Sequence, residues 1–173
     1  MRAKTMIFAL SLFTLGVGVG LEAGKNDEVD ASHFRGHSKE RAAANLLEVA
    51  KNQAGKGSWE HIAVARMHYL SGEKERAQQV FDSIKKKDAS DWIRIGRVYW
   101  QADDWDQAKM AFEQVIDMKP KDEDWLAEIG AYYNLKGDRA KAEELFERSF
   151  REDPDNLYNT LSAAGSYIGL EER

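Results

Sequence analysis

Two histidines, His33 and His37, come closest in this sequence to the spacing of a metal site. Four residues apart on a helix, they would lie on one face, as zinc-binding pairs require. Gly36 separates them, however, and no further ligand lies nearby, so a solvated segment is the better interpretation. His61 and His68 are seven residues apart, and we expect them to be surface or groove residues. The histidines therefore predict no metal site.

An acidic cluster at Asp103, Asp104 and Asp106 has the composition of a cation-binding loop. The glycine and the closing glutamate that a calcium loop needs are missing at their required positions. Carboxylates at the start of a helix favour capping and complement the helix dipole, so we expect that role here. The sequence shows no glycine-rich phosphate loop and no Ser/His/Asp arrangement, and it lacks cysteine. We therefore predict neither an enzyme nor a bound cofactor.

The composition is that of one globular, all-α domain. The 173 residues are 43% hydrophobic and 32% charged, which suits one cored domain better than two. Only two prolines are present and good helix formers are plentiful, so long helices are favoured over a sandwich with many turns. The formal net charge of −5 disfavours nucleic acid and anionic lipid as partners.

Residues 1–23 have the order of a secretory signal peptide of bacterial type. Arg2 and Lys4 precede an uncharged stretch over residues 5–21, and small residues follow. We expect cleavage after Ala23, with cleavage after Gly20 as the second choice. An uncleaved membrane anchor is the alternative, although the apolar stretch is at the short limit for a membrane helix and carries three glycines. We expect a periplasmic protein, with secretion as an alternative, and no membrane insertion after cleavage.

Residues 24–37 are polar and lack helical periodicity, which predicts a flexible linker. Ser38 is suited to cap a helix, and residues 38–55 carry Leu46 and Val49 on one face. The sequence therefore predicts a linker followed by one amphipathic N-terminal helix.

A fixed repeat period organises the rest of the chain. Residues of the same type recur 34 positions apart. They are Ile95 and Ile129, Gly96 and Gly130, Tyr99 and Tyr133, Ala108 and Ala142, Phe112 and Phe146, and Pro120 and Pro154. Together with Trp92 and Leu126, these residues resemble two consecutive tetratricopeptide repeats, whose period and pattern they share. The resemblance implies an antiparallel helix hairpin in each repeat, and an all-α solenoid in which the hairpins stack into a superhelix.

The residue types agree with such hairpins. Gly96 has no side chain, which lets the two helices of a hairpin approach closely. Gly137 suits the left-handed end of a first helix, and Asp138 suits the cap of the second. Asp103 or Asp104 would serve the same turn in the preceding repeat.

The predicted repeats cover residues 89–122 and 123–156. A shorter, degenerate copy covers residues 58–88, where Gly72 and Phe81 match the turn and the aromatic positions. Residues 157–173 match a first helix only, and we expect them to cap the apolar face of the last repeat.

The first helices of stacked hairpins line a concave wall, which solenoids use to bind extended segments. In repeat register, the wall residues that could bind a partner are Trp59, Ile62, Arg66, Tyr69, Ile93, Arg97, Trp100, Gln101 and Asn134. Aromatic and arginine side chains are typical of binding hot spots, and the arginines would suit an acidic ligand. The alternative is that the N-terminal helix folds back into this groove and covers its apolar members.

The resemblance also limits the function. Family members that hold the C-terminal carboxylate of heat-shock chaperones use lysine and asparagine at set groove positions. Ile62 and Arg66 occupy those positions here, so we do not expect that activity.

We expect a non-catalytic protein-protein interaction module, an exported adaptor or scaffold that holds a protein segment in its groove, within a cell-envelope assembly. Two alternatives remain open: a structural solenoid that self-associates into a homo-oligomer without a separate ligand, and an accessory subunit of an envelope enzyme.

Overall fold

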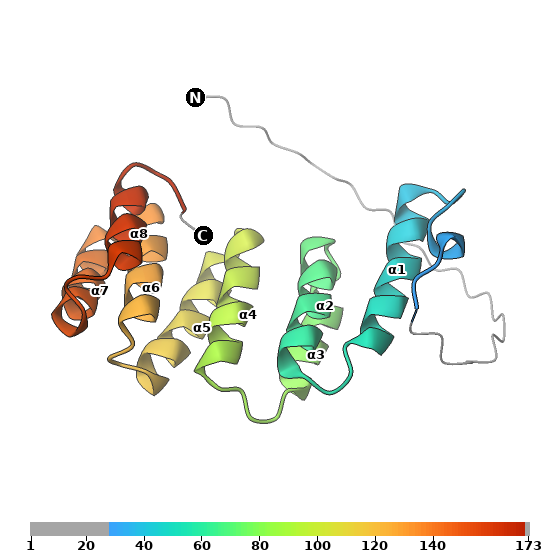
Figure 1. The fold of residues 1–173 in the computed structure, drawn as a ribbon, viewed down its shortest axis with the longest axis horizontal. Coiled ribbons are helices and arrows are strands. Elements are labelled where there is room, and N and C mark those ends of the chain that lie inside the picture. Colours follow the sequence, from blue (N-terminus) through green and yellow to red (C-terminus); the bar gives the residue numbers. More distant parts are fainter. Residues whose placement is uncertain (1–27, 172–173) are drawn as a thin grey trace.

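The computed structural model describes residues 28–171. Within that range it contains eight α-helices, one short 3-10 helix and no strand (Figure 1). The α-helices are α1 (Lys39–Gln53), α2 (Ser58–Leu70), α3 (Lys74–Ser83), α4 (Ala89–Gln101), α5 (Trp105–Met118), α6 (Glu123–Leu135), α7 (Arg139–Glu152) and α8 (Leu157–Tyr167). The expected signal peptide, residues 1–23, lies outside the described residues.

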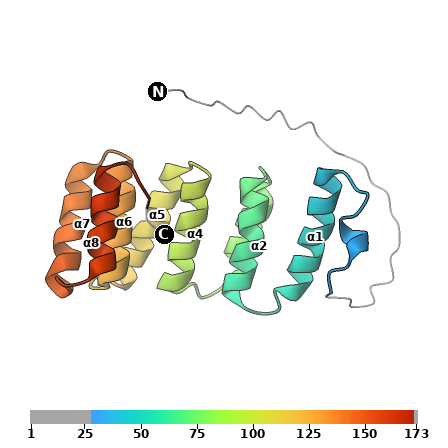
Figure 2. The same cartoon turned by 45° about the horizontal axis from the view of Figure 1, so that its top comes forward.

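Three helix hairpins form the body of the molecule: α2 with α3, α4 with α5, and α6 with α7. Figure 1 shows them side by side, with α1 at one end of the row and α7 and α8 at the other. In the turned view of Figure 2, α1, α2 and α4 follow one another along the same row. The expected all-α hairpin solenoid is therefore confirmed.

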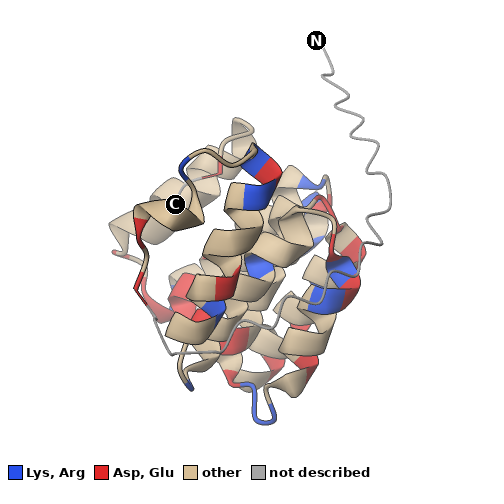
Figure 3. Ribbon diagram, turned by 90° about the vertical axis from the view of Figure 1, so that its right-hand side faces the viewer, with Lys and Arg blue, Asp and Glu red and all other residues tan. Residues whose placement is uncertain are grey.

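Acidic and basic residues are interspersed along these helices, as the ribbon colours of Figure 3 show from the α1 end of the row. Several of them form exposed ion pairs, such as Arg139 with Glu143 and Arg76 with Glu48. Exposed pairs contribute at most about 1 kcal/mol each to stability. The stability of the fold must therefore come mainly from the packing of apolar helix faces.

Each hairpin turns through a residue in the left-handed region of backbone conformation. Gly72 and Gly137 have φ angles of 95° and 92°, and Asp103 takes the corresponding place in the middle hairpin with a φ of 56°. Glycine adopts this conformation without steric cost, and aspartate is one of the few other residues that tolerate it. The turn positions expected from the sequence are therefore confirmed.

The second helices of the hairpins begin in different ways. Asp138 caps α7, because its carboxylate accepts a hydrogen bond from the backbone N–H of Lys141 at 3.2 Å. Asp104 precedes α5 but makes no side-chain cap. Its carboxylate accepts hydrogen bonds from the Tyr69 hydroxyl at 2.8 Å and from Lys74 Nζ at 3.0 Å. The expected capping role is wrong for Asp104, because its carboxylate accepts hydrogen bonds from Tyr69 and Lys74 of the preceding hairpin instead.

Two glycines allow close helix approach within their hairpins. A Cβ atom on Gly96 would overlap the Phe112 ring, and one on Gly130 would lie 2.7 Å from Cε1 of Phe146. An aromatic ring therefore packs directly on bare backbone in both hairpins. This packing offsets the cost of a glycine in a helix, which is about 1 kcal/mol relative to alanine, and confirms the expected close approach.

The core runs continuously through the three hairpins. Its largest fully buried side chains include Phe81, Phe112 and Tyr133, one from each hairpin. The Tyr133 hydroxyl donates a hydrogen bond to Glu113 at 2.5 Å, so this buried polar group is satisfied. Burial and that hydrogen bond raise the pKa of Tyr133 well above its ordinary value, and the phenol therefore stays protonated.

The burial of two side chains differs from what their positions in the repeats indicate. Trp92 is only partly buried, and Lys87 Nζ lies 5.3 Å from the centre of its ring. His68, expected on the surface or in the groove, is 3% exposed. Its Nδ1 lies 3.0 Å from Glu73 Oε2 across the turn of the first hairpin. A surface position is therefore wrong for His68, although its side chain lines, with that of His61, a small cavity of about 170 Å³.

The two ends of the row differ. α1 packs on α2 and buries Val49, so it extends the row and does not fold back along it (Figure 1). Before α1, the expected linker contains a 3-10 helix, η1 (Ala31–His33), which Asp30 caps. Asn45 of α1 donates to the carbonyl of His33 at 3.1 Å. At the other end, α8 packs mainly on α6.

Candidate functional site

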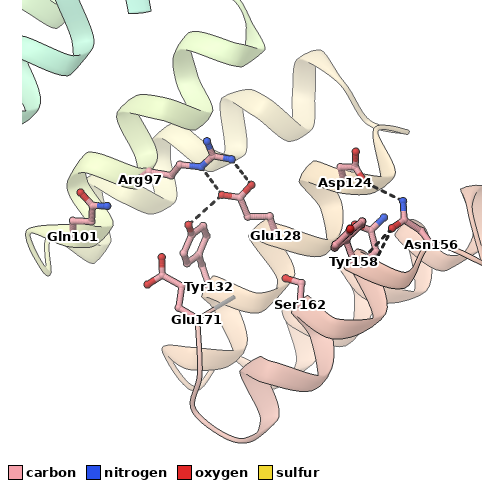
Figure 4. Close-up of a pocket in the computed structure, with 10 residues that line it drawn as sticks. Arg97, Gln101, Asp124, Glu128, Tyr132, Asn156, Tyr158, Ser162 and Glu171 are labelled. Atoms are coloured by element: carbon pink, nitrogen blue, oxygen red, sulfur yellow. Dashed lines mark hydrogen bonds and ion pairs between the residues drawn. The ribbon is translucent and has the colours of Figure 1, made fainter. Parts of the chain in front are cut away.

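A hollow part of the row lies among α4, α6 and α8. A cavity of about 550 Å³ opens there. Its lining is polar and aromatic: Arg97, Gln101, Asp124, Glu128, Tyr132, Asn156, Tyr158, Asn159, Ser162 and Glu171 (Figure 4). We call α2, α4, α6 and α8, the first helices of successive repeats, the inner helices, and this space the inner cavity.

The inner cavity exists because α4 and α6 are held apart. α2 packs directly on α4, and α6 packs directly on α8. Between α4 and α6, contact is made by large side chains: the rings of Trp100 and Tyr132 have centroids 4.8 Å apart, and Arg97 reaches Glu128. Large side chains therefore span the space between α4 and α6.

Arg97 forms a two-pronged ion pair across this gap. Its Nε and one terminal nitrogen each donate to a different oxygen of Glu128, both at 2.6 Å, as Figure 4 shows. The Tyr132 hydroxyl donates to the same carboxylate at 3.1 Å. The hydrogen bonds with Glu128 raise the pKa of Arg97, and burial raises the pKa of Tyr132 well above its ordinary value. The arginine is therefore charged and already engaged within the chain.

The start of α8 forms the opposite wall. Asn156 caps this helix, since its side-chain oxygen accepts from the backbone N–H groups of Tyr158 and Asn159 at 3.1 and 3.2 Å. The amide nitrogen of Asn156 donates to Asp124 of α6 at 3.2 Å. The cap thus fixes the first turn of α8 against α6 and sets the position of the side chains that line the inner cavity.

The segment after α8 returns to the mouth of the inner cavity. The Glu171 carboxylate accepts a hydrogen bond from the Trp100 indole at 2.8 Å. Figure 4 shows this side chain beside Tyr132. The inner cavity is therefore bounded by four elements, α4, α6, α8 and the short segment that follows α8.

The first half of the expected groove is filled. Ile62, Tyr69 and Ile93 are buried core residues, because α2 packs directly on α4. The expectation that these three side chains line an open groove is wrong. Trp59 is half exposed, and its indole donates to Ser90 of α4 at 3.2 Å.

The remaining expected residues divide between the inner cavity and its surroundings. Arg97 and Gln101 line it, and Trp100 lies at its mouth. Arg66 is not among the lining residues, although its Nε donates to the side chain of Gln101, which lines the cavity, at 2.6 Å. Asn134 bridges α6 and α8 through a 2.9 Å hydrogen bond to Ser166.

Most of the lining was not expected from the sequence. The missed residues are Asp124, Glu128, Tyr132, Asn156, Tyr158, Asn159, Ser162 and Glu171. A signal for two of them was present, because Tyr158 and Ser162 lie one repeat period after Asp124 and Glu128. Extending the repeat register into the last helix as a wall of the groove, and not only as a cap, would have found them.

Stacked hairpins with a cavity along their inner helices define the class of helical solenoid interaction modules. Residues 99–165 match the model of a family described as tetratricopeptide repeat, and this match together with the all-helical hairpin fold supports a tetratricopeptide repeat protein. No curated protein matches the sequence. As a tetratricopeptide repeat protein, the chain is a module for binding other proteins, and such modules are typically non-catalytic.

Residues 28–171 contain neither a metal-binding cluster nor a membrane-spanning helix. No group of three or more His, Cys, Asp or Glu side chains in that range is arranged to hold a metal ion. No helix there is long and apolar enough to cross a membrane.

Proposed function

We propose that the protein is a non-catalytic adaptor that holds an extended segment of another protein in the inner cavity. The cavity itself carries this proposal, because it opens in a row of inner helices that are otherwise closely packed. Its walls carry side-chain amides, a hydroxyl and tyrosine rings. Such groups form hydrogen bonds with a main chain and pack on its side chains.

A matched pair of cavity-filling variants tests this proposal. Ser162→Phe places a ring in the inner cavity, whereas Gln114→Phe makes a comparable change in a second cavity of about 530 Å³ that involves α5. Selection from a random-peptide library on the purified protein supplies a binding segment, and calorimetry gives its Kd for each variant. Circular dichroism confirms that both variants fold.

We expect Ser162→Phe to weaken binding at least tenfold and Gln114→Phe to leave it unchanged. Equal effects of the two variants would place binding elsewhere. A selection that yields no segment would contradict the adaptor function itself.

We further propose that the adaptor is exported to the periplasm and acts in a cell-envelope assembly. The charged, apolar and small-residue order of residues 1–23 supports this. Expression of the full chain in a bacterial host, followed by N-terminal sequencing of the periplasmic fraction, tests it. We expect Gly24 as the first residue. An intact Met1 chain in the membrane fraction would instead indicate an anchor.

A second candidate function is self-association through the outer side of α8. Residues 157–170 contain no charged residue, and Leu157 and Ile168 are 62% and 73% exposed. Terminal elements of solenoids usually present a polar outer face. Sedimentation equilibrium of the protein beside Ile168→Glu tests this function: a dimer that the substitution dissociates supports it, and a monomer at all concentrations contradicts it.

A further inference from the structure

The charges around the inner cavity are unbalanced toward acid. Among residues 28–171, three carboxylates line it, those of Asp124, Glu128 and Glu171, and one cation, Arg97. Arg97 uses two of its nitrogens on Glu128. The arginines of the inner helices were expected to suit an acidic ligand, but this pairing leaves Arg97 poorly placed to attract one.

Two of the acids form a like-charge pair on one helix. Asp124 and Glu128 are four residues apart on α6, so they lie on the same face, where like charges repel. Arg97 of α4 neutralises Glu128. Among residues 28–171 no cation forms an ion pair with Asp124, whose hydrogen bond comes from the neutral amide of Asn156. Within residues 28–171, Glu128 is thus paired with a cation and Asp124 is not.

α8, which packs on α6 beside Asp124, has no charged residue that could supply this cation. It brings the Tyr158 ring instead, which is 76% exposed. Asp124 and Tyr158 line the same cavity, and a carboxylate and an exposed aromatic ring together suit a cationic side chain, because an ion pair and a cation–π attraction can act on the same group.

An independent observation comes from Asn159. Its side chain belongs to the lining of the inner cavity and is only 4% exposed, yet its amide nitrogen has no hydrogen-bond partner. An unsatisfied buried donor is costly. A carbonyl oxygen of a segment seated in the inner cavity would satisfy this donor.

We propose that the segment bound in the inner cavity is basic, and that a lysine or arginine side chain of this segment binds between Asp124 and the Tyr158 ring while Asn159 donates to its main chain. This inference rests on the proposed function and defines the class of partner. It replaces the acidic ligand that the arginines of the inner helices indicated.

Three blocked alanine hexapeptides test the charge preference, carrying two lysines, two norleucines or two glutamates at the same positions. Norleucine has a linear side chain close to that of lysine without the ammonium group, so the first two probes separate charge from apolar contact. Titration of the purified protein, followed by NMR, gives Kd for each peptide at low and high salt. We expect the lysine peptide to bind tightest and to weaken as salt rises.

Asp124→Asn is the decisive variant, because asparagine retains an oxygen that can accept from Asn156 while the charge is lost. The matched control is Asp117→Asn, an exposed position on α5 with the same change in net charge. We expect Asp124→Asn to weaken the lysine peptide about tenfold, the size expected for one charge-assisted hydrogen bond, and Asp117→Asn to have no such effect. The norleucine peptide should be insensitive to both variants.

Equal affinities for the lysine and norleucine peptides would overturn the charge preference, as would equal effects of the two asparagine variants. If the hexapeptides fail to bind while a library-selected segment without basic residues binds in a manner sensitive to Ser162→Phe, the adaptor function stands and the basic preference is wrong. If neither the hexapeptides nor any selected segment binds, both proposals fail together.

Discussion

The two neighbouring junctions of inner helices, α2 with α4 and α4 with α6, differ although both join consecutive repeats. In the first, Ile62 and Ile93 are buried and the helices pack directly. In the second, Trp100, Tyr132 and the Arg97 ion pair hold the helices apart. The same repeat geometry thus gives a closed junction in which Ile62 and Ile93 are buried, and an open one with Trp100, Tyr132 and the Arg97 ion pair between the helices.

We therefore expect the closed junction to contribute mainly to stability and the open junction mainly to binding. Substitutions in the closed junction should lower the free energy of unfolding, whereas substitutions in the lining of the inner cavity should change binding with little loss of stability. In a quasi-linear array, each junction can be tested by local changes.

The largest effect should come from the closed junction. Ile93 is 2% exposed, and Ile93→Ala should lower the free energy of unfolding by about 2–5 kcal/mol, because it removes buried methyl groups and leaves a cavity. Denaturant titration measures the change. A loss below about 1 kcal/mol would show that α2 and α4 do not depend on this contact.

The second-largest loss of stability should come from replacing a glycine that packs against an aromatic ring within a hairpin. Gly96→Leu should cost about 1–3 kcal/mol or more, because the new side chain meets the Phe112 ring. Ala164 lies at the equivalent position of α8, one repeat period after Gly130, and is exposed. Ala164→Leu should therefore change stability by no more than about 0.5 kcal/mol. Similar thermal midpoints for the two variants would remove glycine packing as a cause of close helix approach.

A smaller effect should depend on pH. Hydrogen bonds from the Tyr69 hydroxyl and Lys74 lower the pKa of Asp104 below its ordinary value of 3.8. Because the folded-state pKa lies below the unfolded one, the stabilisation is present above about pH 4 and is lost as pH falls through the folded pKa. Asp104→Asn should thus cost about 1 kcal/mol at pH 7 and less at pH 2.

Asp106→Asn, two residues along the same turn, is the control for that pH dependence. Urea titrations of both variants and of the unmodified protein at several pH values measure the difference. If the destabilisation by Asp104→Asn stays constant down to pH 2, the hydrogen-bonded carboxylate is not its cause.

The smallest effect on stability should occur in the open junction. Arg97 and Glu128 are partly exposed, and such pairs contribute up to about 1 kcal/mol. Arg97→Ala should therefore leave the thermal midpoint nearly unchanged. It should also make the inner cavity more acidic and tighten binding of the lysine hexapeptide, as NMR titration would show. Weaker binding would indicate that Arg97 contacts the ligand directly.

Periodicity in the sequence predicted the hairpins well, because Gly96 and Phe112 make the same contact as Gly130 and Phe146 in the next repeat. Local chemistry also predicted the turns at Gly72 and Gly137. A contact that occurs in both repeats can be predicted from a single sequence, because the second repeat provides an independent example of the same residue pattern.

The junctions between repeats were harder to predict. The periodicity placed Ile62 and Arg97 on the inner helices, but their burial and pairing depend on the distance to the next helix. That distance depends on which side chains meet across each junction, Trp100 with Tyr132 in the open one and Tyr69 with Tyr99 in the closed one. Asn159 was missed because α8 was regarded only as a cap.

Tryptophan indole N–H resonances allow the most direct comparison of the two junctions. The Trp59 indole donates to Ser90 in the closed junction, and the Trp100 indole donates to Glu171 at the mouth of the inner cavity. Titration of a bound segment into nitrogen-labelled protein should shift the Trp100 resonance and leave that of Trp59 in place. A shift of Trp59 with no change at Trp100 would contradict the assignment of binding to the open junction.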